Sequence, residues 1–117
     1  MAKETIRVFY KRPGKNLVEV KIPNELEWIQ GAVEGHVEAI TLRESVDGLP
    51  AVMLLCNEEG KLRGMAHNFR INYRGVVDNI VGPVLFVGAD GEEFTDCPMS
   101  RREMETWLRL LGYGGMR

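Results

Sequence analysis

Residues 54–68 read Leu-Leu-Cys-Asn-Glu-Glu-Gly-Lys-Leu-Arg-Gly-Met-Ala-His-Asn and join an apolar segment to a polar turn and a group of hydrogen-bonding side chains. The apolar segment begins at Pro50 and runs to Cys56 without a polar residue. A continuous apolar run of this length indicates a central strand with both faces buried. Residues 57–60 predict a tight turn, because glycine tolerates the positive φ of such turns, and residues 61–63 predict a short returning strand.

Upstream of this strand, the sequence predicts a hairpin, a helix and a further strand. Residues 6–10 and 17–22 alternate apolar and polar side chains around a Pro-Gly turn, which is typical of an antiparallel hairpin. The helix is predicted to span about eleven residues, with Asn24 as its N-cap and Gly35 as the left-handed residue that ends it. Alternation resumes at residues 36–42 and predicts a third strand.

Downstream of the central turn, the regular pattern is lost and then returns. Residues 64–82 mix apolar and polar groups without a clean period, which predicts a loop with one helical turn. Within it, residues 76–81 fit either a strand or a short turn. Residues 84–87 predict another buried strand, and residues 92–95 predict its short return after a hairpin turn.

The last element is the clearest one in the chain. Ser100 and Glu103 have the spacing of a capping box, so they predict the start of an amphipathic helix. Its predicted apolar face consists of Met104, Trp107, Leu108 and Leu111. Residues 113–117 are predicted to form a loose tail. Together these elements predict a single α+β domain over residues 1–117, a mostly antiparallel β-sheet with two amphipathic helices packed on it.

The composition is ordinary for a globular protein, and it argues against several classes of function. Apolar residues make up 44% and charged residues 27% of the 117 residues. With 15 basic and 17 acidic residues the formal charge is −2, which argues against direct nucleic-acid binding through a basic surface. No apolar leader and no run of membrane-spanning length is present, so we expect a cytoplasmic protein in which Cys56 and Cys97 stay reduced.

Three motifs in this order resemble a known family over most of the chain. They are Gly-His-Val-Glu at residues 35–38, Cys-Asn-Glu-Glu-Gly-Lys-Leu-Arg-Gly at residues 56–64, and Asp-Asn-Ile-Val-Gly-Pro-Val-Leu-Phe-Val-Gly at residues 78–88. The chain resembles the domain-of-unknown-function 3846 family of bacteriophages and other mobile elements. It departs from the family pattern at Phe69, where the family has an arginine, and Arg70 follows one position later. The resemblance implies a phage or mobile-element accessory protein and transfers no catalytic residue.

A group of donors and aromatic rings after the central turn is the best candidate for a binding site. Hydrogen-bond donors beside aromatic rings suit an anionic, ring-bearing ligand or a protein surface. The competing interpretation is a polar loop that satisfies its own backbone. The predicted binding residues are Arg63, His67, Asn68, Phe69, Arg70, Tyr73 and Arg74.

Catalytic and metal-binding patterns are weaker. Cys56 and His67 form a conceivable thiolate–imidazole pair, but a cysteine at the end of an apolar run is usually an inert core residue. The two histidines and two cysteines have none of the spacings of structural zinc sites. Residues 82–88 lack the Lys-Ser/Thr pair of a phosphate loop. The sequence therefore predicts no catalytic residue, no metal and no cofactor.

The leading functional hypothesis is a non-enzymatic protein that binds a host protein, such as a defence nuclease or effector, and inhibits a host defence system as anti-CRISPR proteins do. The resemblance motivates this hypothesis, and Trp28, Phe69 and Tyr73 are its candidate anchors. The second hypothesis is a small-molecule binder or sponge for a signalling nucleotide, with arginines of the candidate site on the phosphate. A hydrolase comes third. The continuous apolar strands leave room for a homodimer.

Overall fold

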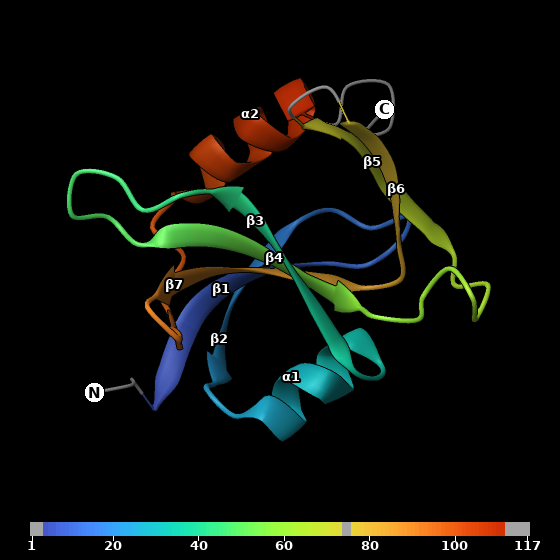
Figure 1. Cartoon of the computed structure of the whole chain (residues 1–117), viewed down its shortest axis with the longest axis horizontal. Coiled ribbons are helices and arrows are strands. Elements are labelled where there is room, and N and C mark those ends of the chain that lie inside the picture. The colour runs from blue at the N-terminus through green and yellow to red at the C-terminus, as the bar shows by residue number, and fades with distance from the viewer. Residues whose placement is uncertain (1–3, 74–75, 112–117) are drawn as a thin grey trace.

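The computed structural model describes residues 4–73 and 76–111, without the side chains of Tyr73, Val76 and Leu111. The expected α+β class is confirmed, because an antiparallel sheet carries two helices (Figure 1). The elements in chain order are β1 (Thr5–Lys11), β2 (Val18–Pro23), α1 (Leu26–Val33), β3 (Val37–Arg43), β4 (Ala51–Asn57), β5 (His67–Tyr73), β6 (Val76–Val81), β7 (Val84–Asp90), β8 (Glu93–Thr95) and α2 (Arg101–Leu111). The tail predicted over residues 113–117 lies outside the described residues.

The main sheet has the strand order β2-β1-β7-β4-β3, and β8 pairs with β7. Every pairing in it is antiparallel, and the predicted β1–β2 hairpin is confirmed. The expected buried strand is β4, which has a neighbour on each side: Leu54 lies opposite Phe86 of β7 and Ile40 of β3. Strands β5 and β6 form a separate two-stranded sheet, called the β5–β6 hairpin below.

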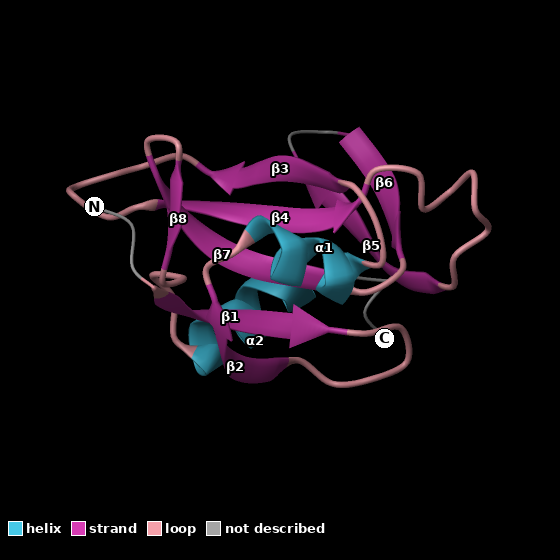
Figure 2. Ribbon diagram, turned by 90° about the horizontal axis from the view of Figure 1, so that it is seen from below, coloured by secondary structure: helices cyan, strands magenta, loops and turns pink. Residues whose placement is uncertain are grey.

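The main sheet is covered on both faces. Helix α1 packs on one face, and α2 with the β5–β6 hairpin covers the other (Figures 1 and 2). Because successive residues of a strand point to opposite faces, Leu55 packs with Ile29 of α1 and Leu54 with Met104 of α2. This two-sided burial explains the lack of alternation in β4. No helix in the described part of the chain is long and apolar enough to cross a membrane.

The strand alternative for residues 76–81 is confirmed by β6 (Val76–Val81), but the predictions for residues 61–63 and for the rest of the loop over residues 64–82 were wrong. Residues 61–63 belong to a turn, and the predicted loop contains strands β5 and β6. The strands face the core with Phe69, Ile71 and Ile80, which are at most 4% exposed. The alternation of apolar and polar residues typical of a strand is not visible in the sequence of β5, because this strand also buries a polar residue, Asn68. The pairing of β5 with β6 also shifts register between His67 and Phe69.

The helix ends were predicted with mixed success. The capping box of α2 is confirmed: the Ser100 amide donates to Glu103 Oε1 (2.9 Å) and the Glu103 amide to Ser100 Oγ (3.1 Å). The expected N-cap of α1 was wrong, because Asn24 donates its side-chain amide to the Phe94 carbonyl instead. Glu34 rather than Gly35 takes the left-handed conformation after α1, with φ 65°. The αL position is therefore one residue earlier than expected.

Candidate functional site

The Asn57 side chain fixes the end of α1 to the turn after β4. Its Nδ2 donates to the carbonyl oxygens of Val33 (3.1 Å) and Glu34 (3.0 Å), and its Oδ1 accepts from the Glu59 amide (2.8 Å). A Cβ atom at Gly35 would lie 2.6 Å from Nδ2, so the close approach requires a glycine there. The most distinctive sequence motif therefore has a structural role as a helix clamp.

Arg63, a predicted binding residue, joins the same clamp. Its Nη1 donates to the Glu34 carbonyl at 2.6 Å, although the side chain remains exposed. The last carbonyl groups of a helix carry partial negative charge, which a guanidinium stabilises. The structure thus gives Arg63 an intramolecular partner at the end of α1.

Asn68 and Phe69, also predicted to bind, are internal. Asn68 is 7% exposed, accepts a hydrogen bond from Lys11 Nζ (2.8 Å), and donates to the carbonyl oxygens of Lys11 (3.0 Å) and Gly82 (2.8 Å). Phe69 is 0% exposed and stacks on Phe86, with ring centroids 6.1 Å apart. The prediction that Phe69 is a surface anchor was therefore wrong, because its ring fills the core.

The remaining predicted binding residues lie at the surface or outside the described part of the chain. His67 and Arg70 are exposed on β5. The Tyr73 side chain and all of Arg74 lie outside the described part. Trp28, the other proposed anchor, is 42% exposed on α1, across the sheet from the β5–β6 hairpin. The predicted cluster is thus divided between a helix clamp, the core and an exposed strand.

The two cysteines lie in the protein interior. Burial raises the pKa of the Cys56 thiol to about 11, with smaller contributions from the carboxylates of Glu38 and Asp78. Burial likewise raises the pKa of Cys97. A raised pKa keeps a thiol protonated and poorly nucleophilic near neutral pH. Among the described residues, no three histidine, cysteine or acidic side chains are grouped as a metal site requires.

A wide, open surface groove between α2 and the end of β3 is another candidate site among the described residues. It has a volume of about 570 Å³, close to that of small-ligand and peptide-anchor pockets. Leu110 on its rim is 75% exposed, and Trp107 is partly exposed. We call it the α2 groove; its lining residues are Arg43, Met99, Arg102, Glu103, Thr106, Trp107 and Leu110.

Arg43 carries unpartnered polar atoms at the wall of the α2 groove. Its Nε and Nη2 are buried, and neither has a hydrogen-bond partner among the residues that the structure describes. Buried guanidinium nitrogens normally have a partner, because a buried unpaired donor costs free energy. The hydrogen bonds from Ser100 lower the pKa of Glu103, and the positive charge of Arg43 lowers it further. Arg43 therefore has unused hydrogen-bonding capacity beside the groove.

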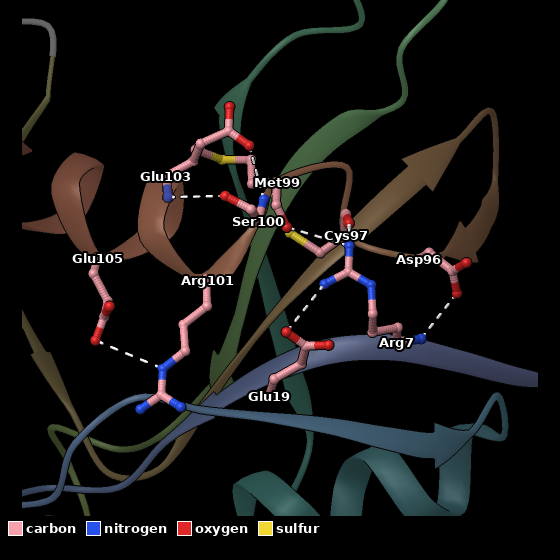
Figure 3. A network of polar contacts seen from close by, with 9 residues as sticks. All are labelled: Arg7, Glu19, Asp96, Cys97, Met99, Ser100, Arg101, Glu103 and Glu105. Atoms are coloured by element: carbon pink, nitrogen blue, oxygen red, sulfur yellow. Dashed lines mark hydrogen bonds and ion pairs between the residues drawn. The ribbon is translucent and has the colours of Figure 1, made fainter.

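A polar network holds α2 and the segment before it against the sheet (Figure 3). Arg7 of β1 donates through Nη2 to the carbonyl oxygens of Cys97 and Met99, and through its amide to Asp96 Oδ1 (2.8 Å). On α2 itself, Arg101 donates to the Leu17 carbonyl (3.1 Å). These bonds fix the α2 groove on a rigid scaffold.

The family model for a domain of unknown function, DUF3846, matches residues 6–111. The chain belongs to the DUF3846 family. This confirms the resemblance noted from the sequence motifs, and the matched part of this DUF3846 chain includes the Asn57 clamp, the Lys11–Asn68 pair and the α2 groove. No curated protein and no solved structure is significantly similar to it. The family description assigns no function.

Sequence reasoning missed the α2 groove of this DUF3846 domain. One signal was available: Leu110 is apolar but lies outside the stripe defined by Met104 and Leu108, which are buried. An apolar residue off the core face of a helix points to a second contact surface. Arg43 carried no signal, because only the tertiary structure brings the end of β3 next to α2.

Proposed function

We propose that this protein acts by binding another protein through the α2 groove rather than by catalysis. In this proposal it is an accessory factor of a phage or mobile element, and its partner is a host protein of a defence system that the binding inhibits. The phage context comes from the family resemblance, and the binding mode comes from the surface of the domain. The two parts are tested separately below.

The observation that carries the proposal is the exposure of Leu110 beside Trp107 on the rim of a wide groove. Large apolar side chains that remain exposed around a concave surface are typical of protein interaction sites. Tryptophan is among the residues most enriched at the energetic centres of interfaces. The raised pKa of the Cys56 thiol adds support, because it disfavours the thiolate that a cysteine hydrolase needs.

The test is affinity purification of the tagged full chain from a bacterial host, followed by reconstitution with the purified candidate. We expect a stoichiometric complex on size exclusion that Leu110→Glu abolishes, because a carboxylate would be buried at the apolar rim. The matched control is Leu26→Glu on α1, where an equally apolar and 62% exposed leucine lies across the sheet from the groove. That variant should retain the complex.

Two results would contradict the proposal. One is repeated purification without any stoichiometric partner. The other is a complex that Leu26→Glu disrupts and Leu110→Glu leaves intact, which would move the interface to α1. Inhibition of a defence system is tested by plaque formation on a host that carries the system, with Leu110→Glu as the inactive form.

A second candidate function is binding of an anionic small molecule, such as a signalling nucleotide. A cleft of about 250 Å³ at the tip of the β1–β2 hairpin favours it, because Arg12 and Lys15 line that cleft with Pro13, Glu34 and Pro83. Basic side chains at such a cleft suit phosphate groups. A thermal shift with nucleotides that Arg12→Ala removes would support this function, and no shift with any nucleotide would reject it.

A further inference from the structure

The unused hydrogen-bonding capacity of Arg43 indicates what the α2 groove binds. The Arg43 side chain comes from the last residue of β3, and its Nε and Nη2 are buried without a partner among the described residues. Folding has already removed water from these atoms. A carboxylate in the groove can reach these atoms once the Arg43 side chain turns toward it, and it would then supply the charge-assisted hydrogen bonds that the described part of the chain does not.

We propose that the α2 groove binds a protein segment in which a carboxylate lies next to a large apolar side chain. This inference rests on the proposed function and specifies the chemistry of the partner. The carboxylate binds the Arg43 guanidinium, whose planar fork suits a carboxylate. The apolar side chain packs against Met99, Trp107 and Leu110, which also line the groove.

The charge of the lining is consistent with an acidic segment. Among the described residues, Arg43 and Arg102 line the groove, and Glu103 is the one acidic residue in its lining. The Glu103 carboxylate already accepts the Ser100 amide in the capping box (2.9 Å). Its negative charge is thus partly satisfied by the helix start, and the groove keeps an excess of positive charge. A nucleic acid is a poorer fit, because the walls are apolar and the whole chain has a formal charge of −2.

The inference is tested with short random peptides displayed on phage and selected on the immobilised full-length protein. Peptides that also bind the Leu110→Glu variant are removed by counter-selection. We expect the enriched sequences to pair Asp or Glu with a nearby Trp, Phe or Leu. A synthetic peptide of the enriched sequence should lose at least about tenfold in affinity when its acid becomes the matching amide, the size expected for one charge-assisted hydrogen bond.

Arg43 is tested on the same peptide pair. The Arg43→Met variant should bind the acidic peptide only as tightly as the native protein binds the amide peptide. Combining Arg43→Met with the acid-to-amide change in the peptide should lower the affinity no further than either change alone. The matched control is Arg109→Met, an exposed arginine on α2 that does not line the groove. A second readout needs no variant: the Arg43 Nε–H resonance should shift on addition of the acidic peptide and not of the amide peptide.

The outcomes separate this inference from the proposed function. The proposal that Arg43 binds a carboxylate is overturned if the enriched peptides lack an acidic residue. It is also overturned if the acidic peptide still binds the Arg43→Met variant more tightly than the amide peptide does. Both outcomes leave a protein-binding groove intact. A concentration-dependent dimer that Leu110→Glu abolishes would also overturn the inference, since a second copy would then occupy the groove. The absence of both enriched peptides and a host partner would reject the inference and the proposed function together.

Discussion

Lys11 and Asn68 hold each other in the interior of the protein through two hydrogen bonds. Lys11 Nζ donates to Asn68 Oδ1 at 2.8 Å, and Asn68 Nδ2 donates back to the Lys11 carbonyl at 3.0 Å. The pair joins β1 of the main sheet to β5 of the β5–β6 hairpin. The ammonium group also lies 5.9 Å from the centroid of the Phe69 ring. Burial lowers the pKa of Lys11, so the charged form depends on these contacts.

Asn68→Ala should destabilise the protein strongly. The change removes the Oδ1 atom that accepts from the Lys11 ammonium group, and Lys11 is 7% exposed. It also removes the Nδ2 group that donates to the carbonyl oxygens of Lys11 and Gly82. We expect the free energy of unfolding to fall by about 3 kcal/mol in urea denaturation, because a buried charge loses its partner. Asn79→Ala, at an exposed position of β6, is the control and should change it by less than about 0.5 kcal/mol. A small effect of Asn68→Ala would mean that water replaces the amide.

The Asn57 clamp should contribute more stability than Arg63 does, although both side chains bind the end of α1. Asn57 is 6% exposed and makes three hydrogen bonds, so Asn57→Ala should cost about 2 to 3 kcal/mol. Arg63 is exposed, so Arg63→Ala should cost less than about 1 kcal/mol. The measurement is thermal and urea unfolding of both variants. The reverse order would contradict the assignment of the central turn as a clamp built on Asn57.

The pKa of Cys56 predicts a loss of stability at alkaline pH. Folding raises this pKa from 9.0 to about 11, so between these values the folded protein keeps a proton that the unfolded chain loses. The protonated Cys56 thiol therefore contributes about 3 kcal/mol to the free energy of unfolding. This contribution is fully present below pH 9 and is lost as the pH rises through about 11. Urea unfolding over this pH range measures it.

Cys56→Ala is the control for that pH dependence, because alanine cannot titrate. The variant should be less stable below pH 9, since it leaves a small cavity, but its stability should decline less steeply above pH 9. An equal decline in both proteins would exclude Cys56 as the cause. In the native protein, alkylating reagents should also leave both buried thiols unmodified near neutral pH.

Arg43→Met should make the folded protein more stable while it removes binding to acidic segments. Methionine keeps the apolar stem and deletes the buried nitrogens that lack partners in the described structure. We expect a gain of about 1 kcal/mol in the free energy of unfolding, the size of one unsatisfied buried group. A substitution that stabilises the fold but removes binding is typical of a residue that serves binding and lowers the stability of the protein. A loss of stability instead would show that Arg43 serves the fold.

Much of the fold could be predicted from the sequence, because the patterns that indicate its elements involve neighbouring residues. The β1–β2 hairpin and the α2 capping box each depend on a few neighbouring residues, and both are present as predicted. The buried strand β4 was readable because apolar residues run without interruption through residues 51–56. In these segments, the local pattern and the tertiary environment favour the same structure.

The β5–β6 hairpin was not readable, because its strands follow no simple period. Asn68 is polar and buried, and a long-range contact with Lys11 of β1 satisfies its acceptor. Phe69 follows it directly in the sequence and is also buried. Two adjacent buried residues of opposite polarity conceal the alternation that identifies a strand. The same feature made a core segment resemble a binding loop.

Local sequence patterns were enough to predict the α+β class, most of the elements and the tight turn after β4. Long-range contacts decide which polar side chains are bonded inside the protein and which stay unpaired among the described residues. Arg63 and Asn68 have intramolecular partners, whereas Arg43 lies beside α2 with two nitrogens unpaired among the described residues. The physical reason is that availability depends on long-range neighbours, and the chain order places Arg43 far from the helix that completes its groove.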